Sequence, residues 1–157
     1  AARNAEYQHM GTTLVCAVAR SDMAIIGNIG DSRAYHITPE GIFQISRDHS
    51  VVENMVAKGD LTPLEARTHP NRNLITRALG PDIHAKADTF ELPWHKDEFL
   101  LLCSDGLVNT VSDQEMLFEV LHDGDVNECL DHLLQISLQR GAPDNITAVL
   151  LLNEEGR

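Results

Sequence analysis

Residues 12–38 read TTLVCAVARSDMAIIGNIGDSRAYHIT, and this run indicates the class of fold to expect. It alternates short apolar, β-branched segments with turn residues, which is typical of consecutive strands joined by tight turns. The turns within it carry Ser, Asp and Gly, and Pro39-Glu40-Gly41 follows directly as another turn signal. The predicted strands cover residues 12–19, 23–29, 34–38 and 42–45. The first third of the chain is therefore predicted to be an antiparallel meander.

The rest of the chain mixes helix signals with further apolar runs. Three Ser or Thr residues are each followed three positions later by Glu, the capping-box signature of a helix N-terminus. These pairs are Ser50 with Glu53, Thr62 with Glu65, and Ser112 with Glu115. Another helix is predicted over 126–139, and further strands over 74–79, 87–92, 98–103 and 146–152. Strands with grouped helices indicate an α+β fold in which helices stack on antiparallel sheets.

The charge of the chain is acidic and unevenly distributed. Its 157 residues include 12 basic and 24 acidic side chains, for a formal net charge of −12, and this length suits one domain. Residues 1–78 hold 8 acids and 8 bases, whereas residues 79–157 hold 16 acids and 4 bases. Nucleic-acid binding needs Lys and Arg to replace counterions, so no nucleic-acid partner is expected, whereas divalent cations would be attracted.

The composition also bears on the cellular location. Three scattered cysteines are too few for a disulfide framework, which favours a reduced, cytoplasmic setting. The longest unbroken apolar runs have about five residues, whereas a membrane-spanning helix needs about 20. No membrane association is therefore expected.

Three aspartates lie where a strand meets a turn. Asp31 and Asp105 follow apolar runs, and Asp144 precedes one. Such positions hold a carboxylate rigidly, and three of them can converge on a hard cation, which prefers oxygen ligands. Asp beside Gly is also ordinary turn chemistry without a metal, and for any single aspartate this alternative is favoured. Asp105 is the exception, because it follows the most hydrophobic strand, where an uncompensated charge is costly.

Other catalytic signatures are absent from the sequence. The eight histidines show no HExxH spacing, and there is no Walker-type phosphate loop or GxSxG nucleophile elbow. Arginine outnumbers lysine nine to three, and its planar fork suits phosphate. Five arginines lie between positions 33 and 77, although solvated charge is the favoured interpretation for Arg47 and Arg67.

Six segments form a pattern when they are taken together. They are GTT (11–13), GNIGDSRAY (27–35), SRDHS (46–50), HPNRNLITRALG (69–80), LLLCSDGL (100–107) and APDNITAVLL (142–151). In this order the segments resemble the metal-dependent serine/threonine protein phosphatases of the type 2C family, in particular the bacterial single-domain members. The resemblance implies an α+β fold, a four-layer αββα sandwich of two antiparallel sheets flanked by helices.

The resemblance also implies a chemistry, the metal-dependent hydrolysis of phosphoserine and phosphothreonine in proteins. Two Mn²⁺ or Mg²⁺ ions would activate a water molecule for in-line attack on phosphorus. Asp105 and Asp144 match metal-binding aspartates of the family, and Asp31 matches the aspartate that joins Asp105 in holding a third ion in bacterial members. No catalytic residue is expected beyond these metal ligands. Residues expected beside the ligands are Ser104, Gly106 and Asn145.

A second family feature is the flap beside the active site, which is thought to influence substrate access. Residues 47–76 match this flap, and its candidate residues are Ser50, His69 and Arg72. The implied partners are phosphorylated proteins, including a cognate Ser/Thr kinase.

The chain also departs from the family pattern. Nothing before Gly11 matches the Arg, the acidic residue and the Asp-Gly-His/Met-Gly segment with which the family domain begins. Residues 1–157 are therefore expected to be the C-terminal portion of one catalytic domain, without its first strands and with an incomplete metal site. Two alternatives stay open: a catalytically inactive phosphatase-like module that binds partners, and a module that self-associates through exposed sheet edges.

Overall fold

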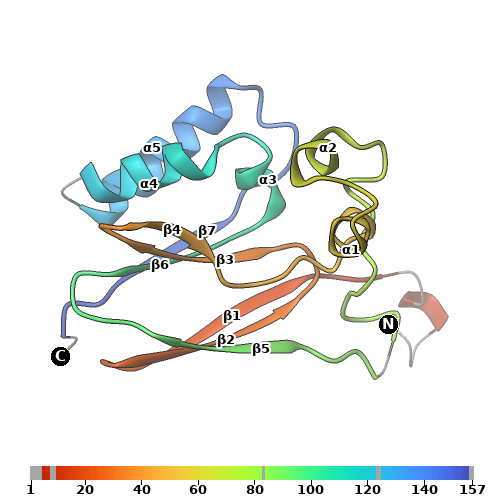
Figure 1. Ribbon diagram of the computed structural model, residues 1–157, viewed down its shortest axis with the longest axis horizontal. Helices are drawn as coiled ribbons and strands as arrows, with labels where there is room; N and C mark the ends of the chain where they lie inside the picture. The colour runs from red at the N-terminus through yellow and green to blue at the C-terminus, as the bar shows by residue number, and fades with distance from the viewer. Residues whose placement is uncertain (1–4, 8–9, 83, 123–124, 156–157) are drawn as a thin grey trace.

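The protein is built on two antiparallel sheets that lie face to face (Figure 1). The computed structural model describes residues 5–7, 10–82, 84–122 and 125–155. The smaller sheet has the order β1 (Leu14–Ala19), β2 (Met23–Ile29), β5 (Asp88–Pro93). The larger sheet has the order β4 (Gly41–Gln44), β3 (Arg33–Thr38), β6 (Phe99–Cys103), β7 (Ala148–Leu152).

The helices are unevenly placed around the sheets. They are η1 (Ala5–Tyr7), α1 (Val51–Lys58), α2 (Pro63–Thr68), α3 (Asp105–Val108), α4 (Asp113–His122) and α5 (Val126–Gln139). The helices α4 and α5 lie against the outer face of the larger sheet, and α1 and α2 lie at one end of the sandwich (Figure 1). The predicted α+β sandwich is therefore confirmed, and in the described part of the chain its helices cover one outer face. No described helix combines the length and the apolar character needed to cross a bilayer.

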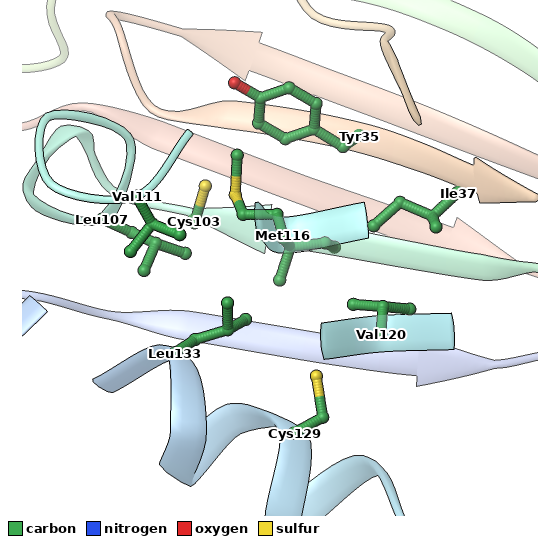
Figure 2. Close-up of a cluster of buried hydrophobic side chains, with 10 residues drawn as sticks. Tyr35, Ile37, Cys103, Leu107, Val111, Met116, Val120, Cys129 and Leu133 are labelled. Carbon is green, nitrogen blue, oxygen red and sulfur yellow. The ribbon is translucent and has the colours of Figure 1, made fainter. Parts of the chain in front are cut away.

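Two apolar cores hold the layers together. One lies on each side of the larger sheet, so β3 and β6 are buried on both faces. The core between the larger sheet and its helices is drawn in Figure 2. Its buried members are Tyr35, Ile37, Leu101, Cys103, Leu107, Val111, Met116, Val120, Cys129 and Leu133. The core between the two sheets contains Ala24, Ile26, Ala34, Leu92, Trp94 and Leu100. Alternate residues of one strand thus enter different cores, as the two-residue period of a strand requires.

The predicted meander is wrong at one point, and this point bears on the site. β1 and β2 form the predicted hairpin, but β2 pairs next with β5, while β3 pairs with β4 and β6. The chain therefore passes from one sheet to the other between Ile29 and Arg33. Gly30 allows this crossing, because its φ of +107° suits glycine and a Cβ there would overlap the side chain of Thr13.

The outer face of the smaller sheet is apolar and exposed. The side chains on it include Leu14, Val18, Met23 and Ile25. The strand predicted over residues 12–19 is present as β1, and it is buried only on the face that meets the larger sheet. The hydrophobic run alone does not distinguish a strand covered on both faces from one covered on a single face.

The helical insertion between β4 and β5 follows its predicted caps. The Ser50 hydroxyl accepts a hydrogen bond from the Glu53 N–H over 3.1 Å, and α1 ends at Gly59 with a φ of +81°. Thr62 and Glu65 form the complete capping box of α2. The strand predicted over 74–79 is absent, since this segment makes only isolated bridges to Ser50, Thr12 and Asp82. Among the described residues no strand runs alongside this segment, so its β-branched residues have no sheet to join.

Candidate metal centre

Asp105 lies where β6 ends and the short helix α3 begins. The segment was predicted as a turn, and the four-residue helix was not foreseen. The Ser104 N–H donates to the Thr147 carbonyl over 2.9 Å, and the Thr147 N–H donates to the Ser104 hydroxyl over 3.0 Å. These bonds tie the Asp105 segment to the segment that joins Asp144 to β7.

Gly106 makes the approach of these two segments possible. A Cβ at this position would lie 3.0 Å from the carbonyl carbon of Asn145 and closer still to its oxygen, so only glycine fits without a backbone shift. The Asn145 N–H donates to Asp144 Oδ1 over 2.7 Å, which orients that carboxylate. Ser104, Gly106 and Asn145 therefore all act on the placement of Asp105 and Asp144.

Asp31 reaches the same end of the sandwich from the crossing between the sheets. Hydrogen bonds hold the residues on both sides of it. The hydroxyls of Thr13 and Ser32 lie 2.9 Å apart, and the Gly30 N–H donates to His49 Nδ1 over 3.0 Å. The turn is thus fixed to the residue before β1 on one side and to the segment before α1 on the other.

The strand register brings the segments of the three aspartates to the same end of the larger sheet, because Cys103 pairs with both Arg33 and Ala148. Burial raises the pKa of Asp31 above its ordinary value, and the charge of Asp105 adds to this effect. Burial also raises the pKa of Asp105, with a further contribution from the charge of Asp144. Asp105 is therefore the middle carboxylate of the three, and the site carries mutual repulsion that a bound cation would relieve.

An ion pair between Arg33 and Asp48 lies beside this site and was not predicted from the sequence. Arg33 donates from Nε and Nη2 to the carboxylate of Asp48, the shortest contact being 2.7 Å, and from Nη1 to the Tyr35 hydroxyl over 3.0 Å. Gln44 also donates to Asp48 over 3.0 Å. Arg33 was a candidate for phosphate contact, but Asp48 already occupies its planar fork. The pair spans 15 positions of sequence and depends on the pairing of β3 with β4, so no local motif could reveal it.

The helices α1 and α2 of the flap lie at the same end of the molecule as α3 (Figure 1). Ser50 is buried and caps α1. His69 is half-buried at the end of α2, where its Nδ1 accepts the Asn71 N–H over 3.1 Å. Arg72 is exposed. Ser50 thus supports the local structure, while Arg72 is available to a ligand.

The fit of a metal ion is partial. Carboxylate oxygens are the ligands that Mg²⁺ and Mn²⁺ prefer, and Asp31, Asp105 and Asp144 supply them from the same end of the larger sheet. Across residues 5–7, 10–82, 84–122 and 125–155, no group of three or more His, Cys, Asp or Glu side chains is arranged to hold a metal ion by itself. The described residues therefore fit one side of a metal centre.

A family model described as protein phosphatase 2C matches residues 1–150. The chain belongs to the protein phosphatase 2C family. Among curated members, it is 36% identical over 151 residues to the serine/threonine phosphatase stp of Listeria monocytogenes, covering 94% of this chain and 60% of that protein. It is 37% identical over 150 residues to the protein phosphatase PhpP of Streptococcus pneumoniae, covering 95% and 61%. The chain thus spans about three fifths of the length of these protein phosphatase 2C relatives.

Solved structures of the family have the same fold. The serine/threonine phosphatase Stp1 from Staphylococcus aureus matches with a TM-score of 0.90 and 42% identity, over 96% of this chain and 59% of that one. The catalytic domain of the phosphatase PstP in complex with two manganese ions matches with a TM-score of 0.81 and 34% identity, over 91% and 59%. These matches place the described sheets and helices within the protein phosphatase 2C fold.

Proposed function

We propose that this chain is part of a protein phosphatase that removes phosphate from phosphoserine and phosphothreonine with the help of Mn²⁺ or Mg²⁺. The observation that carries the proposal is the coupling of Asp31, Asp105 and Asp144 at one end of the sandwich. Family membership supports the reaction, because relatives that match most of this chain are named serine/threonine phosphatases. The complex of PstP with two manganese ions supports the choice of cation.

The residues of this chain would hold the metal from one side. Asp105 and Asp144 would ligate the two ions, and Asp31 with Asp105 would hold a third. When bound, such ions lower the pKa of a coordinated water and neutralise charge on the phosphate. The close contact of Gly106 with the Asn145 carbonyl keeps Asp105 and Asp144 at a set separation. The Asn145 N–H holds one oxygen of Asp144, so the other oxygen stays available as a ligand.

The flap, residues 47–76, would contribute to contact with the phosphoprotein. It contains α1 and α2, each with its own cap, and it carries the exposed Arg72. An exposed arginine beside an acidic, metal-holding site suits the phosphate or the acidic neighbours of a phosphorylated residue. The proposed partners are cytoplasmic phosphoproteins, including a cognate Ser/Thr kinase.

Metal binding to the purified chain tests the proposal directly. We expect Mn²⁺ to bind in calorimetry and to stabilise the chain against urea by about 2.7 kcal/mol at a hundredfold excess over its dissociation constant. Asp105→Asn should abolish both effects. Asp60→Asn, the same chemical change at an exposed loop position, should leave both unchanged.

Phosphatase activity is measured in parallel on this chain and on the full-length protein. The substrates are a phosphothreonine peptide and p-nitrophenyl phosphate, each with and without Mn²⁺. We expect the full-length protein to hydrolyse both substrates only with Mn²⁺, and we expect Asp105→Asn to abolish this activity. If the full-length protein is inactive at every Mn²⁺ concentration, the proposed reaction is refuted and a binding module is favoured.

A further inference from the structure

His49 is a buried residue at which three parts of the fold meet. Its side chain is 6% exposed, and both ring nitrogens have partners. Nδ1 accepts the Gly30 N–H over 3.0 Å, and Nε2 lies 3.0 Å from Asp88 Oδ2 on β5. Its own N–H donates to the Gly30 carbonyl over 2.8 Å, and its carbonyl accepts the Thr76 N–H over 2.7 Å. Four hydrogen bonds therefore connect this one residue to segments far apart in the sequence.

The partners define the protonation of the ring. A backbone N–H can only donate, so Nδ1 carries no proton and the ring proton is on Nε2, which donates to Asp88. The second oxygen of Asp88 accepts from Arg77 over 2.6 Å. The hydrogen bond from His49, followed by that from Arg77, lowers the pKa of Asp88, so its carboxylate is charged and oriented toward both partners.

The partners of His49 also lie at functionally distinct places. Gly30 precedes Asp31 in the crossing between the sheets, while Thr76 and Arg77 follow directly on the isolated bridge between Ile75 and Ser50. His49 itself immediately precedes the N-cap of α1. The ring of His49 thus connects the Gly30 turn to Asp88 on β5, while the backbone carbonyl of His49 connects the first end of the flap to Thr76 at its second end.

We propose that His49 is a positioning residue that holds the Asp31 turn in place and joins it to the two ends of the flap. The part of this inference that concerns Asp31 rests on the proposed function, because it takes Asp31 to be a metal ligand. The part that concerns the Gly30 hydrogen bond does not depend on any metal.

The chemistry explains why an apolar residue would not serve. The Gly30 N–H belongs to a residue with φ of +107°, so no regular ladder partner receives it. Without Nδ1, this buried donor would have no acceptor, and the turn would have to open to reach water. A histidine supplies an acceptor toward Gly30 and a donor toward Asp88 from one rigid ring.

Two substitutions separate the two ends of the ring. In His49→Asn the amide oxygen can take the place of Nδ1, so the acceptor for Gly30 is kept and the donor to Asp88 is lost. In His49→Gln the amide nitrogen can take the place of Nε2, so the donor to Asp88 is kept and the acceptor for Gly30 is lost. The two variants thus differ in which bond survives, although both replace a ring by an amide.

Amide hydrogen exchange and Mn²⁺ calorimetry on the full chain are the readouts. In His49→Gln we expect the Gly30 amide to exchange at least about tenfold faster and Mn²⁺ affinity to fall about tenfold. In His49→Asn we expect both to stay near the unaltered values, because the acceptor for the Gly30 N–H is kept. Equal Gly30 exchange in the two variants would overturn the proposal.

A measurement on the unaltered chain keeps the test independent of how the variants fold. Nitrogen-15 NMR of His49 at neutral pH should show an unprotonated Nδ1 and a protonated Nε2, and the opposite tautomer would overturn the proposal. If the two variants differ at Gly30 as expected but bind Mn²⁺ with equal affinity, the positioning role stands and the metal assignment of Asp31 fails.

Discussion

Replacing Gly106 with alanine probes the contact that brings the Asp105 and Asp144 segments together. The change adds one methyl group inside the short helix α3, where alanine is normally favoured over glycine by about 0.5–1 kcal/mol. Helix propensity alone therefore predicts a more stable chain. The structure predicts the opposite sign.

The magnitude follows from the distance to the neighbouring backbone. The new Cβ would lie 3.0 Å from the Asn145 carbonyl carbon, whereas ordinary contact begins at 3.4 Å, so this atom must retreat by at least 0.4 Å and its oxygen by more. That retreat strains the bonds between Ser104 and Thr147. Overpacking against backbone costs about 1–3 kcal/mol, which exceeds the gain in helix propensity. For a chain of this size we expect the unfolding temperature to fall by roughly 3–10 °C.

Urea unfolding followed by circular dichroism measures the stability, and calorimetry measures Mn²⁺ binding. We expect Gly106→Ala to weaken Mn²⁺ binding about tenfold, because Asp105 and Asp144 move apart. Gly59→Ala is the matched control, since its φ of +81° makes alanine costly by about 1–2 kcal/mol while nothing lies within 4 Å of the new Cβ. The control should lose stability and keep Mn²⁺ affinity. If Gly106→Ala is as stable as the unaltered chain or more so, the packing argument is wrong.

Two further predictions concern the charges around the site. The folded-state pKa values of Asp31 and Asp105 are raised. Without metal, the chain should therefore lose stability relative to Asp105→Asn as the pH rises above about 4. Urea unfolding between pH 4 and 7 measures this, and parallel stability profiles of the two proteins would contradict it. Asp48→Asn leaves the guanidinium of Arg33, whose side chain is 27% exposed, without its counter-charge, and should cost about 2–3 kcal/mol in the same assay. Glu53→Gln is the control, since it removes the exposed ion pair with Arg47 and should cost under about 1 kcal/mol of stability. Equal losses of stability in the two variants would refute the special role of Asp48.

Much of the local structure could be predicted because its causes are local. Ser50 and Thr62 accept the N–H of the residue three positions later, and this geometry needs no other part of the chain. The predicted helix over 126–139 has the bounds of α5, since its apolar spacing matches one helical face. The prediction of a strand over 74–79 is wrong because its cause is not local. A strand needs a neighbouring strand, which the segment itself does not supply.

The turn chemistry, the helix caps, the apolar periodicity and the order of motifs that identifies the family can all be seen in the amino-acid sequence. It also singled out Asp31, Asp105 and Asp144, because a carboxylate beside a strand end is visible in a short window. Three features appear only in the folded chain: the change of sheet beside Asp31, the pair of Arg33 with Asp48, and the bonds by which His49 joins the flap to the Gly30 turn. These contacts link residues from 15 to 39 positions apart, and they form only when the pairing of the strands has brought the segments together.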